Sequence, residues 1–600
     1  MPGKFPGLWL QFGYYETGVR CHAESAIIDG CMRYLALASD YDGTLAHDGA
    51  VDEATLRAVE RLKHSGRRFV LVTGRELADL QSVFPRLDVC DRVVAENGAL
   101  IYNPATREKR LLAHRPPESF LEDLQRRGVS DMSVGDAIVA TWRPHEQQAI
   151  EAIRDSGLEL QIIFNKDAVM ILPSGVNKMT GLCAALDELK LSPHNVAAIG
   201  DAENDHAFLA SCECAVAVAN AIPALKEKAD YVTHGARGEG VVEFIQKIVE
   251  NDLSDLVLKP EHNRILVGRS ETGDEVCLPV YGRNLLICGH SGSGKSTAVT
   301  GLLERIMEKK YQVCVIDPEG DYENLSNCRT LGDEKRPPTI EHIQQVLEEP
   351  EAQVIVNLVA VSAADRPHHF ASITSEIQHL RLQAGRPHWL IIDEAHHVLP
   401  SEWAPVSTEM SQELSNLVLI TVHPEHVSPI ALKRVNTVLL IGKEPKGSLE
   451  EFGKKAEMTV PDVPAADLER GEALLCFLDE QRVTKLKIEL PRHDHFRHRR
   501  KYAEGQLEPE REFHFRGPAG KMDLRAQNMN TFLQIAEGID AETWSYHLTR
   551  GDYSNWLRNA LKDSELADQI AEIETDDSLS DREGRDRVRN AISQKYTAPA

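Results

Sequence analysis

The sequence predicts an α/β protein with two successive parallel sheets and a helical C-terminal region. Short apolar strands alternate with helical patterns over residues 33–251 and again over residues 282–490. Such alternation is typical of parallel strands joined by helices. The strands of the second block are apolar throughout, which favours burial on both faces of a sheet. From about residue 511, apolar residues recur at helical spacing instead.

The composition is that of a globular protein with several domains. The chain has 600 residues, of which 42% are hydrophobic and 27% charged, and this length suggests three or four domains. Its 11 cysteines are scattered, so we predict a reduced, cytoplasmic protein without a disulfide framework or a structural zinc site. We find neither an apolar run of the roughly 18 residues that cross a bilayer nor a secretory signal, and we expect no membrane partner.

The net charge is strongly acidic. There are 67 basic and 93 acidic residues, which gives a formal charge of −26. Such a surface repels nucleic acid on average, because non-specific binding depends on neutralising phosphates. Residues 492–501 form the one concentrated basic stretch. It is either a contact for phosphate backbones or a solvated connector, so nucleic acid stays a candidate partner only through a local basic region.

These patterns divide the chain into six segments. We expect an extension, disordered or loosely docked, at 1–32; a first α/β domain at 33–251; a linker with a small β-rich segment at 252–281; a second α/β domain at 282–490; a basic connector at 491–510; and a helical domain with an acidic tail at 511–600.

A first candidate site begins where an early strand ends. The sequence Asp-Tyr-Asp-Gly-Thr at 40–44 follows an apolar run, and the turn can aim Asp40 and Asp42 at one point. One carboxylate can then attack phosphorus while the other handles a proton, and both can share a hard cation such as Mg²⁺. A lone motif of this kind is more often an ordinary turn.

Three further segments strengthen that prediction. Each stands at a strand end or a helix start and offers a group for phosphate or metal. They are Thr73 in Val-Thr-Gly-Arg at 72–75, Lys178 in Asn-Lys-Met-Thr-Gly at 177–181, and Asp201 and Asp205 in Gly-Asp-Ala-Glu-Asn-Asp at 200–205. Four such segments in this order are not expected by chance.

Together the four motifs resemble those of the haloacid dehalogenase superfamily, and within it the Cof-like class IIB group of sugar phosphatases and phosphoglycolate phosphatases. The resemblance covers residues 33–251 and implies a Rossmann-like core. It implies that Asp40 is the nucleophile that forms an aspartyl-phosphate, and that Asp42 is the general acid and then the base. Thr73 and Lys178 would hold the phosphoryl group.

The same resemblance implies a metal and a cap. Asp201 would bind Mg²⁺ together with the Asp40 carboxylate and the Asp42 backbone carbonyl, and Asp205 would support it. About a hundred residues separate the second and third motifs, which fits an inserted α/β cap at about 103–173. A cap excludes water and selects the leaving group. The motifs indicate phosphomonoester hydrolysis and leave the substrate open among sugar phosphates, phosphoglycolate and nucleotides.

A second candidate site is a phosphate-binding loop at 289–297. The pattern Gly-x4-Gly-Lys-Ser follows an apolar strand at 285–288 and precedes a helical run at 298–307, as the mechanism requires. Backbone N–H groups close around the phosphates, Lys295 reaches the β and γ groups, and Ser296 ligates Mg²⁺. The predicted ATP contacts are Gly289, Ser291, Gly292, Ser293, Gly294, Lys295, Ser296 and Thr297.

An acidic pair at the end of another strand is the expected partner of the phosphate-binding loop. The strand at 389–392 ends in Asp393 and Glu394. Asp393 is suited to the magnesium shell, and Glu394 is the candidate base that orients the attacking water.

The second block resembles the HerA/FtsK branch of RecA-like ATPases. The resemblance rests on Ile-Asp-Pro-Glu-Gly-Asp-Tyr at 316–322 and Asp-Glu-Ala-His-His at 393–397, and it covers about 260–490. It implies a homo-oligomeric ring, typically a hexamer, that acts on DNA or on macromolecular cargo.

Two positions test that resemblance. A polar sensor, usually Gln, is expected after the strand at 417–420, and here Thr421 or His423 must fill the role. Arg434 is the candidate trans finger that completes a neighbour's site, with an ordinary surface arginine as the alternative.

The leading hypothesis is a bifunctional Mg²⁺-dependent phosphatase coupled to an oligomeric ATPase, in which ATP gates or delivers phosphatase substrate. The alternative is a HerA-like nucleic-acid translocase or anti-phage defence effector, whose phosphatase acts on nucleotides or nucleic-acid ends. In a third hypothesis the phosphatase domain is only a scaffold or sensor.

Overall fold

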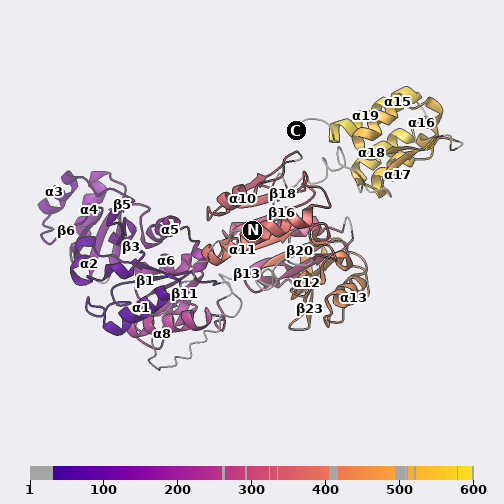
Figure 1. Ribbon diagram of the computed structural model, residues 1–600. Helices are drawn as coiled ribbons and strands as arrows, with labels where there is room; N and C mark the ends of the chain where they lie inside the picture. The colour runs from indigo at the N-terminus through magenta and orange to yellow at the C-terminus, as the bar shows by residue number, and fades with distance from the viewer. Residues whose placement is uncertain are drawn as a thin grey trace, which may run out of the picture.

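The computed structural model describes most of residues 32–596 (Figure 1). The residues outside the description are 1–31, 166, 260–263, 291–292, 323–324, 334, 404–415, 493–506, 508–510, 519, 521, 562, 577–578 and 597–600. Nearly all of the expected N-terminal extension, most of the basic connector, and the predicted ATP contacts Ser291 and Gly292 therefore lie outside the described residues. Within the described part of the chain, no helix combines the length and apolarity needed to cross a membrane.

The first sheet has eight strands in the order β12-β11-β10-β1-β2-β3-β4-β5. The six strands from β12 to β3 are parallel, and β4 and β5 add antiparallel partners at one edge. The strands are β1 (Ala36–Asp40), β2 (Arg68–Val72), β3 (Arg92–Ala95), β4 (Leu100–Asn103), β5 (Glu108–Leu111), β10 (Val196–Gly200), β11 (Cys214–Ala217) and β12 (Tyr231–Val232).

Helices join and cover these strands. Every residue of β1 and β10 is buried, as predicted for apolar strands in a parallel sheet. The helices are α1 (Glu53–His64), α2 (Leu77–Val83), α5 (Lys178–Glu188), α6 (His206–Ser211), α7 (Pro223–Lys228) and α8 (Gly238–Asn251).

A small α/β unit is inserted between β5 and α5. Its antiparallel sheet has the order β6-β7-β9-β8, and the apolar faces of its two helices pack together with that sheet in a separate small core. The elements are α3 (Glu118–Arg126), β6 (Ser133–Val134), β7 (Val139–Trp142), α4 (Glu146–Ser156), β8 (Leu160–Asn165) and β9 (Ala168–Pro173). The insertion has the place and the composition expected of a cap.

Among the residues that the structure describes, the second sheet has eleven strands in the order β14-β13-β23-β22-β21-β15-β20-β19-β16-β18-β17. The seven strands from β21 to β17 are parallel. The strands are β13 (Arg264–Ser270), β14 (Glu275–Pro279), β15 (Leu285–Cys288), β16 (Val313–Asp317), β17 (Cys328–Leu331), β18 (Gln353–Asn357), β19 (Trp389–Ile392), β20 (Leu417–Thr421), β21 (Thr437–Ile441), β22 (Glu472–Phe477) and β23 (Arg482–Ile488).

In the described part of this domain, five helices accompany the sheet, and the α/β alternation predicted from the sequence is confirmed. The helices are α9 (Lys295–Glu308), α10 (Ile340–Leu347), α11 (Arg366–Ala384), α12 (Pro429–Leu432) and α13 (Pro445–Ala456). The segment 252–281, which we expected to be a linker with a small β-rich segment, carries the strands β13 and β14. These strands extend the second sheet, because β13 pairs with β23.

The C-terminal region is helical, as predicted. A short hairpin of β24 (Phe513–Phe515) and β25 (Leu524–Ala526) packs with the five helices described in this region around an aromatic core. Trp544 and Tyr553 stack in that core with ring centroids 4.5 Å apart. The helices are α15 (Met529–Gly538), α16 (Ala541–Leu548), α17 (Asp552–Asn559), α18 (Ser564–Glu574) and α19 (Asp581–Tyr596).

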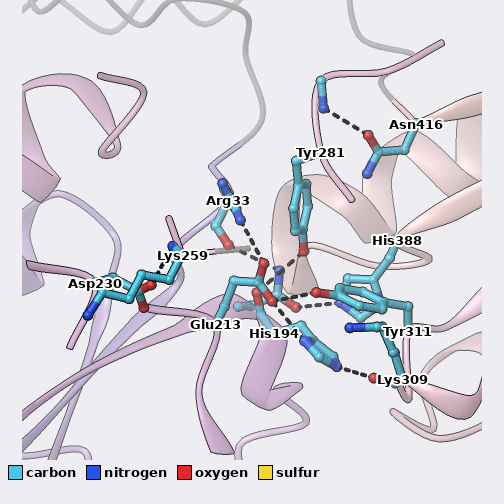
Figure 2. A network of polar contacts seen from close by, with 12 residues as sticks. Arg33, His194, Glu213, Asp230, Lys259, Tyr281, Lys309, Tyr311, His388 and Asn416 are labelled. Carbon is cyan, nitrogen blue, oxygen red and sulfur yellow. Dashed lines mark hydrogen bonds and ion pairs between the residues drawn. The ribbon is translucent and has the colours of Figure 1, made fainter. Parts of the chain in front are cut away.

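The two large sheets meet at the amino ends of their parallel strands, through what we call the base junction (Figure 2). The first sheet contributes Arg33, Asn195 and Glu213, which lie just before β1, β10 and β11. The second contributes Tyr311 and His388, which lie just before β16 and β19. The carboxyl ends of the parallel strands lie at the opposite end of each sheet, about one strand length, or roughly 16 Å, from the junction.

The carboxylate of Glu213 is the centre of the base junction. It is 3% exposed and accepts hydrogen bonds from Arg33 at 2.6 Å, His194 Nδ1 at 2.8 Å and, across the junction, Tyr311 Oη at 2.7 Å. The His194 and Tyr311 rings stack at 3.7 Å. Burial alone would raise the pKa of Glu213, but the hydrogen bond from His194 and the charge of Arg33 outweigh it and hold the pKa below its ordinary value.

A second set of contacts surrounds Asn195. His388 Nε2 donates to Asn195 Oδ1 at 3.3 Å, while His388 Nδ1 accepts the backbone N–H of Gln312 at 2.8 Å. The Asn195 amide also donates to the carbonyl of Gly385 at 3.4 Å. Gly385 has a φ of 63° and leaves no room for a side chain, because a Cβ would lie 2.3 Å from Asn195 Nδ2. The two domains are therefore docked through buried, mutually satisfied polar groups.

Candidate active sites

The first site lies at the carboxyl ends of β1 and β10, which are neighbours in the first sheet. β1 ends at Asp40, and Asp201 follows β10 directly. Asp40, Asp201 and Asp205 present carboxylate oxygens within 4.8 Å of one another, and all three are buried. The structure thus brings together acidic residues from distant motifs.

Lys178 lies between two of these carboxylates. Its Nζ donates to Asp40 Oδ1 and to Asp205 Oδ1, both at 2.6 Å. Lys178 opens α5, where Asn177 and Thr180 form a reciprocal capping box that fixes the first turn. Burial alone would lower the pKa of Lys178, but the two carboxylates outweigh burial and raise it above its ordinary value. The ammonium is therefore charged at neutral pH.

The charge of this cluster fits a divalent cation. Three carboxylates face one ammonium, so the fully ionised cluster carries two net negative charges. Burial and then the charge of Asp205 raise the pKa of Asp40 well above its ordinary value. A divalent ion would offset both costs, and carboxylate oxygens are ligands that Mg²⁺ prefers. The donor set therefore fits Mg²⁺.

Asp42 and Thr73 lie beside this cluster, and an arginine joins them. Thr73 is buried directly after β2, and its Oγ1 accepts the backbone N–H of Arg75 at 3.1 Å. Arg75 forms a bidentate pair with Asp42, from Nε at 2.7 Å and from a terminal nitrogen at 2.8 Å. Sequence reasoning gave Arg75 no role, and its only signal was its place two residues after Thr73.

The phosphate-binding loop connects β15 to α9. Lys295 is buried and donates from Nζ to the carbonyls of Gly289 at 2.7 Å and His290 at 2.9 Å. Gly294, with a φ of 102°, precedes the helix, and Ser296 and Thr297 lie in the first helical turn. Phosphate oxygens would replace the two carbonyls as acceptors for the Lys295 ammonium.

The acidic pair ends β19, on the same edge of the second sheet. β20 separates β19 from β15, so Asp393 and the phosphate-binding loop end about two strand spacings, roughly 10 Å, apart. Asp317 ends the neighbouring strand β16, and burial together with the charge of Asp393 raises its pKa to about 7. Glu394 has a φ of 39°, which places it in the left-handed region at the turn.

Histidines surround the position where a polar sensor was expected. Thr421 is fully buried at the end of β20, and its Oγ1 is 3.1 Å from His396 Nδ1. His423, Glu425 and His426 present possible ligand atoms within 4.8 Å of one another, so a metal ion could be held there as well.

Arg434 lies at the amino ends of the parallel strands, whereas the phosphate-binding loop of the same chain lies at their carboxyl ends. It precedes β21, and its carbonyl accepts a hydrogen bond from Asn284 at 3.0 Å. The structure therefore does not bring Arg434 to the nucleotide site of its own chain.

Comparison with known proteins identifies both α/β domains. Residues 37–156 and 143–245 match the model for haloacid dehalogenase-like hydrolases, and residues 266–384 match the model for the central domain of helicase HerA. The phosphoglycolate phosphatase of Methanothermobacter thermautotrophicus is 30% identical over 223 residues, which are 36% of this chain and 98% of that protein. Phosphoglycolate phosphatase 2 of Saccharolobus solfataricus is 32% identical over 226 residues, 36% of this chain and 94% of that protein.

The chain therefore belongs to the haloacid dehalogenase-like hydrolase family. It carries a phosphatase domain of that family, joined to a HerA-like ATPase domain, and the predicted resemblance to both is confirmed. Among solved structures, a haloacid dehalogenase-like hydrolase from Bacteroides thetaiotaomicron is 21% identical, with a TM-score of 0.32, and covers 36% of this chain and 99% of its own.

Proposed function

We propose that this protein is a Mg²⁺-dependent phosphomonoesterase whose activity is coupled to ATP binding by its second domain. The observation that carries the phosphatase part is the buried cluster in which Lys178 bridges Asp40 and Asp205, 2.6 Å from each. A nucleophile, a permanent positive charge and a metal-binding set at one strand edge are what phosphoryl transfer through an aspartate requires.

The catalytic steps follow from this arrangement. A carboxylate oxygen of Asp40 attacks phosphorus as the bond to the leaving oxygen breaks, and Asp42 gives its proton to that oxygen. Asp42 then takes a proton from water, whose oxygen attacks the aspartyl-phosphate, frees Asp40 and releases phosphate. Lys178 and Thr73 hold the phosphoryl oxygens. Mg²⁺ held by Asp40, Asp201 and the Asp42 carbonyl would offset the charge of the phosphoryl group.

The substrate class we propose is a small phosphomonoester, with phosphoglycolate first and sugar phosphates and nucleotides next. The relatives named above carry that substrate in their names. A direct test compares hydrolysis of these three classes by the wild type and by Asp40→Asn with Mg²⁺ present. Turnover that disappears in Asp40→Asn supports the proposal, and unchanged turnover in that variant contradicts it.

Coupling to the ATPase is supported by the base junction. Both candidate sites lie at the carboxyl ends of the parallel strands, whereas the junction lies at the amino ends. Within one chain, a substrate therefore cannot pass directly from one site to the other. The continuous buried contacts from Glu213 to Tyr311 and from Asn195 to His388 favour gating through the fold instead. A homo-oligomer formed by the ATPase domains would make such gating cooperative.

The coupling has its own test. Phosphatase kinetics of the wild type and of Lys295→Ala are measured over a range of ATP concentrations. We expect ATP to change kcat or KM in the wild type and to have no effect in Lys295→Ala. If ATP changes neither parameter in the wild type while both activities are present, the two enzymes are independent.

A second candidate function is a nucleic-acid translocase, favoured by the match to helicase HerA. The net charge of −26 opposes it. Stimulation of ATP hydrolysis by DNA or RNA would support this function, and the absence of any stimulation would remove it.

A further inference from the structure

A buried glutamate links the cap to the catalytic edge. Glu96 directly follows β3 in the short turn Glu96–Gly98 and is 1% exposed. Its carboxylate crosses to the cap and accepts three backbone N–H groups of the loop between β6 and β7. The donors are Asp136 at 2.9 Å, Ala137 at 2.7 Å and Ile138 at 3.1 Å.

The fit between this carboxylate and the cap loop is close. Consecutive backbone N–H groups that converge on one carboxylate form an anion-binding nest, and hydrogen bonds to an ionised acceptor are the strong ones. Gly135 at the start of the loop is needed for this approach, because a Cβ there would lie 2.7 Å from Glu96 Oε2. A second contact joins the same hairpin to the core, where Ser133 donates to Glu76.

The turn that carries Glu96 also touches the catalytic loops of the core. The backbone N–H of Glu96 donates to the Arg75 carbonyl at 2.9 Å, and that of Asn97 donates to the Thr73 carbonyl at 3.0 Å. The Asn97 side chain accepts a hydrogen bond from Asn204, which lies between the acidic residues Asp201 and Asp205.

The third neighbour of this turn is the helix that carries Lys178. Gly98, at a φ of 104°, approaches so closely that a Cβ would lie 1.9 Å from the carbonyl of Asn177. On the cap side, β8 contacts the 3-10 turn Glu203–Asp205. One short turn is therefore in contact with three catalytic segments of the core and with the cap loop.

We propose that Glu96 is a positioning residue that anchors the β6–β7 hairpin of the cap over the phosphoryl site and thereby limits the size of the leaving group. The proposal rests on the phosphatase function proposed above and deepens it. Both oxygens of the Glu96 carboxylate bind the cap loop, so Glu96 acts through that loop. Loss of these hydrogen bonds frees the hairpin. The hairpin then no longer closes over a small substrate, and the site admits a bulkier leaving group.

The experiment compares Glu96→Gln and Glu96→Ala with Glu122→Gln, a control at an exposed position of the cap helix α3. The first readout is hydrogen–deuterium exchange at residues 136–138 of the full chain. Both Glu96 variants should exchange these amides faster, Glu96→Ala more so, while β1 and β10 stay protected. Unchanged exchange at 136–138 in Glu96→Ala would overturn the anchor whether or not the protein hydrolyses phosphate.

The second readout is the ratio of kcat/KM for phosphoglycolate to kcat/KM for a bulky aryl phosphate. We expect the ratio to fall about ten- to a hundred-fold in Glu96→Ala, less in Glu96→Gln, and not at all in Glu122→Gln. A parallel loss for both substrates would indicate a purely structural role and contradict the specificity role. If the wild type has no phosphatase activity, the proposed function is wrong. The exchange result then still decides whether Glu96 anchors the cap hairpin.

Discussion

At the scale of single residues, the ion pair between Arg75 and Asp42 bears on how Asp42 acts in the proposed mechanism. In the mechanism proposed above, Asp42 passes a proton to the leaving oxygen and then takes one from water, and in the structure it faces a guanidinium through two hydrogen bonds. Such a bidentate pair fixes the relative orientation of the two groups. Arg75 therefore orients the Asp42 carboxylate.

We predict that Arg75→Gln lowers kcat for phosphomonoester hydrolysis about ten- to a hundred-fold, because Asp42 loses the group that orients it. Arg86→Gln is the matched control, since Arg86 makes the same kind of double contact with Asp88 at the surface. Steady-state kinetics of both variants provide the measurement. Equal loss in the two variants would show that the effect is not specific to Asp42.

Much of the first site could be predicted from the sequence, because Asp40, Asp201 and Lys178 stand in motifs where strands end or helices begin. Parallel strands release their carboxyl ends at one edge, so such residues converge. The partners of Arg75 and Glu96 could not be predicted. Arg75 meets Asp42 from a neighbouring strand, and the carboxylate of Glu96 binds backbone N–H groups of an inserted domain, which carry no sequence signal.

At the scale of elements, the close packing of α5 fixes the position of Lys178. Gly181 faces the turn after β3, and a Cβ there would lie 2.5 Å from both Gly98 Cα and Val94 Cγ1. Val94 lies in β3, and Gly98 offers backbone of the turn that follows it, so neither can yield easily. The helix that carries Lys178 is therefore placed by the absence of a side chain at Gly181.

We predict that Gly181→Ala lowers the free energy of unfolding by about 1–3 kcal/mol through overpacking and also lowers kcat, because Lys178 moves with the helix. The control is Gly447→Ala in α13, where no atom lies within 4 Å of the added Cβ and alanine favours the helix. Denaturant titration and phosphatase assays provide the measurements. A stable and fully active Gly181→Ala variant would contradict this account of α5.

The alternation of strands and helices predicted the parallel part of both sheets. It did not predict that β13 and β14 join the second sheet. Pairing between β13 and β23 connects residues far apart in sequence, and strand pairing depends on which edge is free after the parallel core has formed. Local patterns contain no such information.

At the scale of the whole molecule, the base junction makes the stability of the pair of domains sensitive to pH. Burial, and then the nearby His194 ring and Arg386 guanidinium, lower the pKa of His388 well below its ordinary value of 6.5. Its Nδ1 accepts a backbone N–H, which a protonated ring could not do. As the pH falls below about 6.5, the unfolded chain binds a proton that the folded chain does not, so stability decreases.

We predict that between pH 6 and pH 5 the wild type loses about 1 kcal/mol more unfolding free energy than His388→Asn, because one group with a lowered pKa contributes about 1.4 kcal/mol per pH unit. Asparagine keeps an acceptor for the Gln312 N–H but does not titrate. Denaturant titrations at several pH values provide the measurement. Parallel pH profiles for the two proteins would exclude His388 as the titrating group.

The base junction also has a consequence for how such a chain can be rebuilt. Among the described residues, the contacts of the base junction lie at the amino ends of the parallel strands, whereas both candidate sites lie at the carboxyl ends. A different phosphatase core could be grafted onto this ATPase if it offered the counterparts of Asn195 and Glu213 at its base. The junction would then join such a core to the ATPase domain in the same way, whatever reaction that core catalyses.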